Sequence, residues 1–189
     1  MKKIFPVMIL VGLFLCGSGY LSGGERYSAK LMTRGGPNTE PVLKIQISID
    51  SYTTGEEAWQ LMELLDKGGY EPFINAFRKT NKGSLLFMSA RGLKVDIHVA
   101  QVMPKENGRK IMLFTERQGW EMDVFQRVDG RYPFLVIELE LDNKGKGEGR
   151  IYENAQIKFT GNASDGTARM EMEGYSSAPK NLFGVQLIK

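Results

Sequence analysis

His98, the only histidine of the chain, follows Asp96 and Lys94 in the stretch KVDIH. In an extended strand alternate side chains share one face, so these three side chains are expected to project together. Asp96 could orient the His98 ring, and His98 could act as a general base toward a nucleophile from another strand, such as Ser48 or Ser84. A polar strand face is more often simply solvated, so we treat the set only as a weak catalytic candidate.

Two pairs of carboxylates, Glu138/Glu140 and Glu171/Glu173, also alternate along predicted strands. Residues two apart on a strand are about 6.5–7 Å apart, a separation that the carboxylates of a glycosidase can adopt. Acidic strand faces are also common as solubilising features, and basic partners are available for these pairs in Arg131, Lys158 and Arg169. A hydrolase built on Asp96 and His98, or on an acidic pair, therefore stays the alternative hypothesis.

Large apolar side chains supply the candidates for ligand binding. Trp59, Met62, Phe73 and Phe77 lie in the part of the chain with helical periodicity. They are expected to pack on a sheet, or to enclose with it a pocket for an apolar ligand. Trp120 follows a glycine in a predicted turn or bulge, where an exposed ring would indicate a contact surface.

Most of the chain alternates apolar and polar residues with period two. In VLKIQISID, residues 42–50, every second side chain is apolar, which predicts a half-buried strand. LKVDIHVAQV, residues 93–102, repeats the pattern with Leu93, Val95, Ile97 and Val99 expected on one face. Similar segments with Asn-Gly, Asp-Gly or glycine-rich connections follow and indicate successive hairpins.

One segment breaks this alternation. Thr54 and Glu57 have the spacing of a capping box, and apolar residues then recur at helical spacing up to the glycines at 68 and 69. Pro72 suits the first turn of a second helix. The sequence therefore predicts a helical pair over about 55–67 and 71–80, inserted into a single mainly-β domain, residues 25–189. We expect an α+β fold, with a curved antiparallel meander or barrel-like sheet of about 8–10 strands.

The glycine-rich stretch NKGKGEG, residues 143–149, is interpreted as a hairpin turn. A phosphate-binding loop would need Gly-Lys followed by Ser or Thr and then a helix, but Glu148 follows Gly147 and a strand pattern comes next. The surrounding segment RYPFLVIELELDNKGKGEG resembles a part of an uncharacterised family of small exported bacterial proteins. That resemblance implies export and carries no activity or catalytic residue.

The N-terminus has the pattern of a secretion signal. A basic start, MKK, precedes an apolar run over residues 4–15 and then small residues, so residues 1–24 are predicted to be a secretion signal, with an uncleaved N-terminal anchor as the alternative. Cys16, the only cysteine, lies in it, and lipidation at Cys16 is a minor alternative because bulky Leu15 precedes it. Without Lys2 and Lys3 the 25 basic residues fall to 23, against 22 acidic ones, so basicity gives no argument for nucleic acid.

These features predict a periplasmic or secreted domain without a cofactor, a metal site or a membrane span in its mature part. A site with one histidine and no cysteine would have to be completed by carboxylates alone, which disfavours zinc. We expect a non-enzymatic binding or structural domain whose partner is a protein, a surface component or a small apolar ligand held between sheet and helices.

Overall fold

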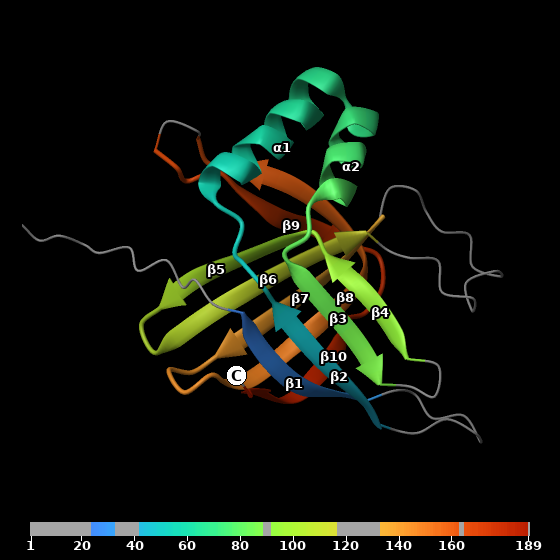
Figure 1. The fold of residues 1–189 in the computed structure, drawn as a ribbon, viewed down its shortest axis with the longest axis vertical. Helices are drawn as coiled ribbons and strands as arrows, with labels where there is room; N and C mark the ends of the chain where they lie inside the picture. Colours follow the sequence, from blue (N-terminus) through green and yellow to red (C-terminus); the bar gives the residue numbers. More distant parts are fainter. Residues whose placement is uncertain (1–23, 33–41, 89–91, 117–132, 163–164, 189) are drawn as a thin grey trace, which may run out of the picture.

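The computed structural model describes residues 24–32, 42–88, 92–116, 133–162 and 165–188. These residues form ten strands and two helices (Figure 1). The strands are β1 (Glu25–Met32), β2 (Val42–Ile49), β3 (Gly83–Met88), β4 (Leu93–Ile97), β5 (Val99–Lys105), β6 (Gly108–Glu116), β7 (Phe134–Leu141), β8 (Lys146–Thr160), β9 (Arg169–Tyr175) and β10 (Lys180–Leu187). The helices are α1 (Gly55–Gly68) and α2 (Tyr70–Lys79).

All ten strands belong to one antiparallel sheet, in the order β4-β3-β2-β1-β10-β8-β7-β6-β5, with β9 paired to the distal half of β8. The predicted mainly-β fold, its antiparallel meander and its helical pair are thus confirmed. The sheet is strongly curved but not closed. Its two end strands, β4 and β5, are consecutive in the chain and meet at a bend at His98.

This bend corrects the prediction of one continuous strand over residues 93–102. The His98 amide donates to the Phe114 carbonyl (3.0 Å), and the Thr80 hydroxyl donates to the His98 carbonyl (2.8 Å), which fixes the corner. Ile97 packs in one core cluster and Val99 in another, so the expected common face of Leu93, Val95, Ile97 and Val99 is wrong at its last member. The chain thereby passes from pairing with β3 to pairing with β6.

Two apolar clusters hold the fold together. The first fills the inside of the curved sheet and draws on nearly all strands, with Tyr27, Ile47, Ile97, Ile111 and Ile137 fully buried. The second lies on the opposite face of β6, β7 and β8, beneath the helices. Strand β7 therefore buries both faces, whereas β1 to β4 bury only one, and Figure 1 shows no helix over their outer face.

The helical pair has the capping box and the glycine stop that the sequence predicted. Thr54 Oγ1 accepts from the Glu57 amide (3.2 Å) and Glu57 accepts from the Thr54 amide (2.8 Å), which completes the capping box. Gly69, with φ of +80°, ends α1 and begins α2. Phe73, Ile74 and Phe77 form the buried face of α2.

The stretch NKGKGEG belongs to the hairpin of β7 and β8, as predicted: residues 143–145 lie in the turn, and residues 146–149 begin β8. The Asp142 carboxylate accepts from the amides of Lys144 and Lys146 (both 2.8 Å). Gly145 has a positive φ (+72°), whereas Gly147 and Gly149 do not. Gly147 lies in β8, where the neighbouring strand leaves no room for a Cβ, because such an atom would lie 1.8 Å from the Glu140 carbonyl oxygen.

Candidate binding cleft beside the second helix

A cleft of about 240 Å³ opens where α2 meets the sheet. Its walls come from the end of α1, the start of α2, the start of β7 and the region where β8 pairs with β9. Its lining residues are Leu65, Tyr70, Phe73, Pro133, Phe134, Gln156, Ile157 and Glu173. Most of these side chains are apolar, which is typical of a small-molecule or side-chain binding site.

Aromatic rings form the floor of the cleft. Phe73 is 1% exposed and lies with its ring centroid 6.3 Å from that of Phe134 and 5.9 Å from that of Phe159, the latter in an edge-on arrangement. Tyr70 continues this group toward solvent, with its centroid 6.2 Å from Phe73 and 45% of its surface exposed. An incoming ring could extend this cluster in the edge-on or tilted arrangements that aromatic pairs prefer.

An irregularity where β8 pairs with β9 shapes one wall. Gln156 is opposite Gly174 and Ile157 is opposite Met172, so Glu173 is an extra residue in β9, a β-bulge. Ile157 keeps the ordinary alternation of β8, because it packs in the same core cluster as Ala155 and Phe159. Gln156 also lines the cleft, so an amide group lies beside the apolar wall.

The Glu173 carboxylate and the Tyr70 hydroxyl are polar groups at the rim of the cleft. Glu173, on β9, is exposed, and within the described ranges it makes no ion pair. Burial and the negative charge of Glu116 raise the pKa of Tyr70, so its phenol stays neutral and can donate a hydrogen bond. The rim can therefore bind a cation at Glu173 while the floor holds an apolar group.

Aromatic side chains pack directly beneath the helices. Phe77 is fully buried, with its ring centroid 5.5 Å from that of Phe134. The cleft lies beside this packed region. Of the residues predicted to bind a ligand, Phe73 lines this cleft, while Trp59 and Met62 are half-buried on α1 away from it. Trp120 lies outside the described residues.

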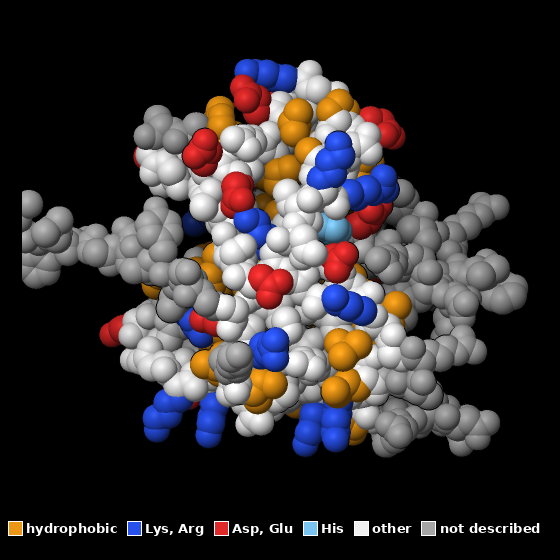
Figure 2. Space-filling model, viewed as in Figure 1, with side chains coloured by type: hydrophobic (Ala, Val, Ile, Leu, Met, Phe, Trp, Pro, Cys, Tyr) orange, Lys and Arg blue, Asp and Glu red, His pale blue; other side chains and the backbone are white. Residues whose placement is uncertain are grey.

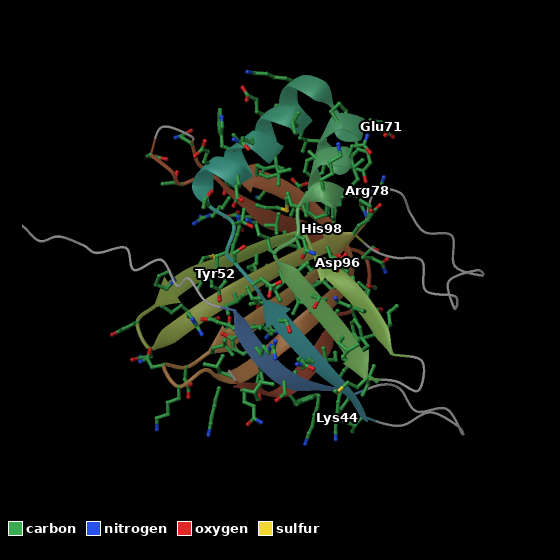
Figure 3. All side chains as sticks on the ribbon, viewed as in Figure 1. Lys44, Tyr52, Glu71, Arg78, Asp96 and His98 are labelled. Atoms are coloured by element: carbon green, nitrogen blue, oxygen red, sulfur yellow. The ribbon has the colours of Figure 1, made fainter. Side chains whose placement is uncertain are left out.

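The catalytic candidates are not brought together around a cleft. Lys94 and Asp96 are exposed on β4, while His98 lies beyond its end, at the bend (Figure 3). His98 Nδ1 is 2.7 Å from the Thr80 carbonyl oxygen, so Nδ1 donates to a backbone acceptor, and Asp96 is not its partner. Phe77 packs against the ring with centroids 4.8 Å apart. These contacts give His98 a structural role at the corner.

The possible nucleophiles and acidic pairs have ordinary surroundings. Ser84 is opposite Asp96 and Ser48 is opposite Ser84, on the outer face of the sheet. Glu138 is 2.6 Å from Lys110, and Glu140 is 3.0 Å from Lys105, which lowers the pKa of Glu140. In the second pair, Glu171 is bound by Arg169 at 2.7 Å.

A second, more open cleft of about 430 Å³ lies at the turn between β5 and β6. Its charged lining is largely neutralised, because Lys105 pairs with Glu140 and Arg109 pairs with Glu25 (2.9 Å). We therefore regard the aromatic cleft as the stronger candidate, because its rim carboxylate has no ion-pair partner among the described residues.

Sequence reasoning missed a polar network at this end of the sheet. Glu25 accepts hydrogen bonds from the hydroxyls of Tyr27 and Tyr52 (both 2.6 Å), and Arg109 donates to Glu25 and to the Tyr27 hydroxyl (2.6 Å). Burial raises the pKa of Glu25, but the two phenols and the positive charge of Arg109 outweigh it and hold the pKa below its usual value. The sequence signal for this network was that Glu25 and Arg109 each occupy a strand position whose neighbours two residues away point into the core.

No protein-family model, curated protein or solved structure matches the chain. Among the residues that the structure describes, no group of three or more His, Cys, Asp or Glu is placed to hold a metal ion. No helix within the described ranges has the length and apolar character needed to cross a bilayer.

Proposed function

We propose that the chain is an exported, non-enzymatic binding domain. Its aromatic cleft would hold an apolar or aromatic side chain of a partner protein, with a basic group of that partner at the rim. The observation that carries this proposal is the combination of a floor of buried rings with a rim carboxylate, Glu173, that has no ion-pair partner among the described residues.

The size of the cleft favours a side chain over a larger free ligand. Pockets for drug-sized ligands span about 300–1,000 Å³, whereas this cleft encloses about 240 Å³ and is open to solvent. One aromatic ring fits such a volume. Because Glu173 lies at the rim of the cleft, it favours a ring that carries a positively charged group nearby.

Small probes test this directly. Phenethylamine carries a ring and an ammonium group, phenylacetate a ring and a carboxylate, and ethylamine an ammonium group alone. Titrated into the ¹⁵N- and methyl-labelled protein, phenethylamine is expected to shift the NMR signals of Ile157, Leu65 and Gln156, with a Kd of about 1 mM. Phenylacetate should bind more weakly, and ethylamine should give no shift at these residues.

Two rim variants separate the contribution of the Glu173 charge to probe binding from that of the Tyr70 ring. Glu173→Gln is expected to weaken phenethylamine about two- to fivefold, the effect of an exposed ion pair, and to leave phenylacetate no weaker. Tyr70→Ala should weaken both aromatic probes. Glu171→Gln, on the same strand, is the matched control and should change neither. The proposal fails if the shifts of bound phenethylamine map away from the cleft, or if Glu171→Gln has the same effect as Glu173→Gln.

A further inference from the structure

The outer face of β1, β2, β3 and β10 carries a second surface, independent of the cleft. Register places Phe183, Lys30, Lys44 and Met88 side by side across these four strands. All four side chains are exposed, Met88 by 50% and Phe183 by 38%. Figure 3 shows Lys44 at the lower edge of the molecule, and in Figure 2 lysine or arginine side chains project from this edge beside hydrophobic ones.

The neighbouring positions extend the same mixture. Met32 is 61% exposed and lies opposite Val42, which is 39% exposed. Lys94, on β4, is exposed and has no acidic partner in the described ranges. We define the Lys30–Lys44 face as the outward side chains Lys30, Met32, Val42, Lys44, Met88, Lys94 and Phe183.

The lysines at the centre of this face are not compensated by a described acidic side chain, whereas Asp96 shares the outer face of β4 with Lys94. Lys30 and Lys44 are direct cross-strand partners, and neither makes an ion pair within the part of the chain that the structure describes. Like charges directly opposite one another on a sheet are destabilising. An anionic partner would relieve that repulsion, whereas a second copy of the chain would bring the same positive face and add to it.

We propose that the Lys30–Lys44 face docks on an anionic lipid surface. The lysines would bind the headgroups, while Met32, Met88 and Phe183 enter the interfacial region between them. Exposed apolar side chains among these lysines suit a lipid surface, because such a surface offers negative charge and an apolar layer together. A soluble polyanion would satisfy the lysines and leave these apolar side chains in water.

Vesicle co-sedimentation of the full-length chain tests the proposal, with vesicles of phosphatidylglycerol and phosphatidylcholine compared with pure phosphatidylcholine. Each lysine near an anionic surface contributes about 1 kcal/mol, so Lys30→Glu/Lys44→Glu should weaken binding to the anionic vesicles at least about 30-fold. Met32→Ser/Met88→Ser should weaken it about tenfold. Lys67→Glu/Lys79→Glu, on the helical pair, changes the charge equally and should bind like the wild type.

Residues 1–23 are the same in all variants. A difference in vesicle binding between two variants is therefore due to the substituted residues. Circular dichroism confirms that each variant is folded. Equal binding by the Lys30/Lys44 and Lys67/Lys79 variants overturns the proposal, as does wild-type binding that is the same for both vesicle compositions. Loss of heparin binding in the Lys30/Lys44 variant, with unchanged vesicle binding, would assign the face to a soluble polyanion and also overturn it.

Discussion

Arg109 Nη1 donates a 2.9 Å hydrogen bond to Glu25 Oε1, joining two residues 84 positions apart in the chain. Glu25 lies on β1 and Arg109 on β6, strands that are not neighbours in the sheet. Both side chains point to the inside of the curved sheet, and only 12% and 19% of their surfaces are exposed. The pair therefore bridges the interior at one end of the first core cluster, with two tyrosine hydroxyls completing its hydrogen bonds.

Removing the cation of this pair should destabilise the fold. Arg109→Met leaves the Glu25 carboxylate with phenol donors alone, and we expect a loss of about 2–3 kcal/mol, less than for a fully buried pair because some solvent reaches it. Urea denaturation measures the change. Lys180→Met, which breaks an exposed pair with Glu153, is the control and should cost less than about 1 kcal/mol. Equal losses in the two variants would show that the interior pair has no special weight.

The lowered pKa of Glu25 gives stability a dependence on acid. A depressed pKa stabilises the folded state above the unfolded value of about 4.3, and this contribution disappears as the pH falls through the folded pKa. The difference in Tm between the wild type and Glu25→Gln should therefore be largest near neutral pH and shrink below about pH 4. A difference that stays constant between pH 7 and pH 3 would contradict the assignment.

Helix α2 should depend on apolar packing more than on its ion pair with the sheet. Phe77 is fully buried, so Phe77→Ala should cost about 3–5 kcal/mol. Arg78 forms two hydrogen bonds to Glu116 (2.6 and 2.5 Å), but its side chain is 51% exposed, so Arg78→Met should cost less than about 1 kcal/mol. Thermal unfolding followed at 222 nm compares them, and a larger loss from Arg78→Met would reverse our ranking.

The start of β8 provides a steric test. Gly147→Ala should destabilise the protein by about 2–3 kcal/mol, because a Cβ would lie 1.8 Å from the Glu140 carbonyl oxygen and the strands would have to separate. Gly174→Ala is the matched control, since the nearest atom to its Cβ would be Gln156 Oε1 at 3.9 Å. If the two alanine variants unfold at the same urea concentration, the close approach at Gly147 is not real.

Local signals predicted the elements well. The capping box at Thr54, the alternation over residues 42–50 and the glycine turn after Asp142 each depend on neighbours a few residues away, and each forms as expected. The corner at His98 could not be seen, because the alternation of the sequence continues through it. Only contacts with Thr80 and Phe114, distant in the chain, fix the bend.

The cleft was only partly predictable, because contacts between residues distant in the chain form it. Phe73 was identified from its place on the helix, but Ile157 and Glu173 line the cleft because β9 pairs with the distal half of β8 and carries a bulge at Glu173. The sequence pattern alone does not specify such pairing between distant strands. The Lys30–Lys44 face likewise depends on register, which places two lysines 14 positions apart directly opposite one another.

We propose above that the cleft beside α2 holds an aromatic group with a cation at its rim. Intermolecular NOEs between bound phenethylamine and the labelled protein test it most directly. We expect NOEs from the ring protons of the probe to the Ile157 methyl groups and the Phe73 ring, and from its methylene next to nitrogen to Glu173. NOEs confined to other surfaces, or a ring that contacts Glu173 while the ammonium group points toward Phe73, would contradict it.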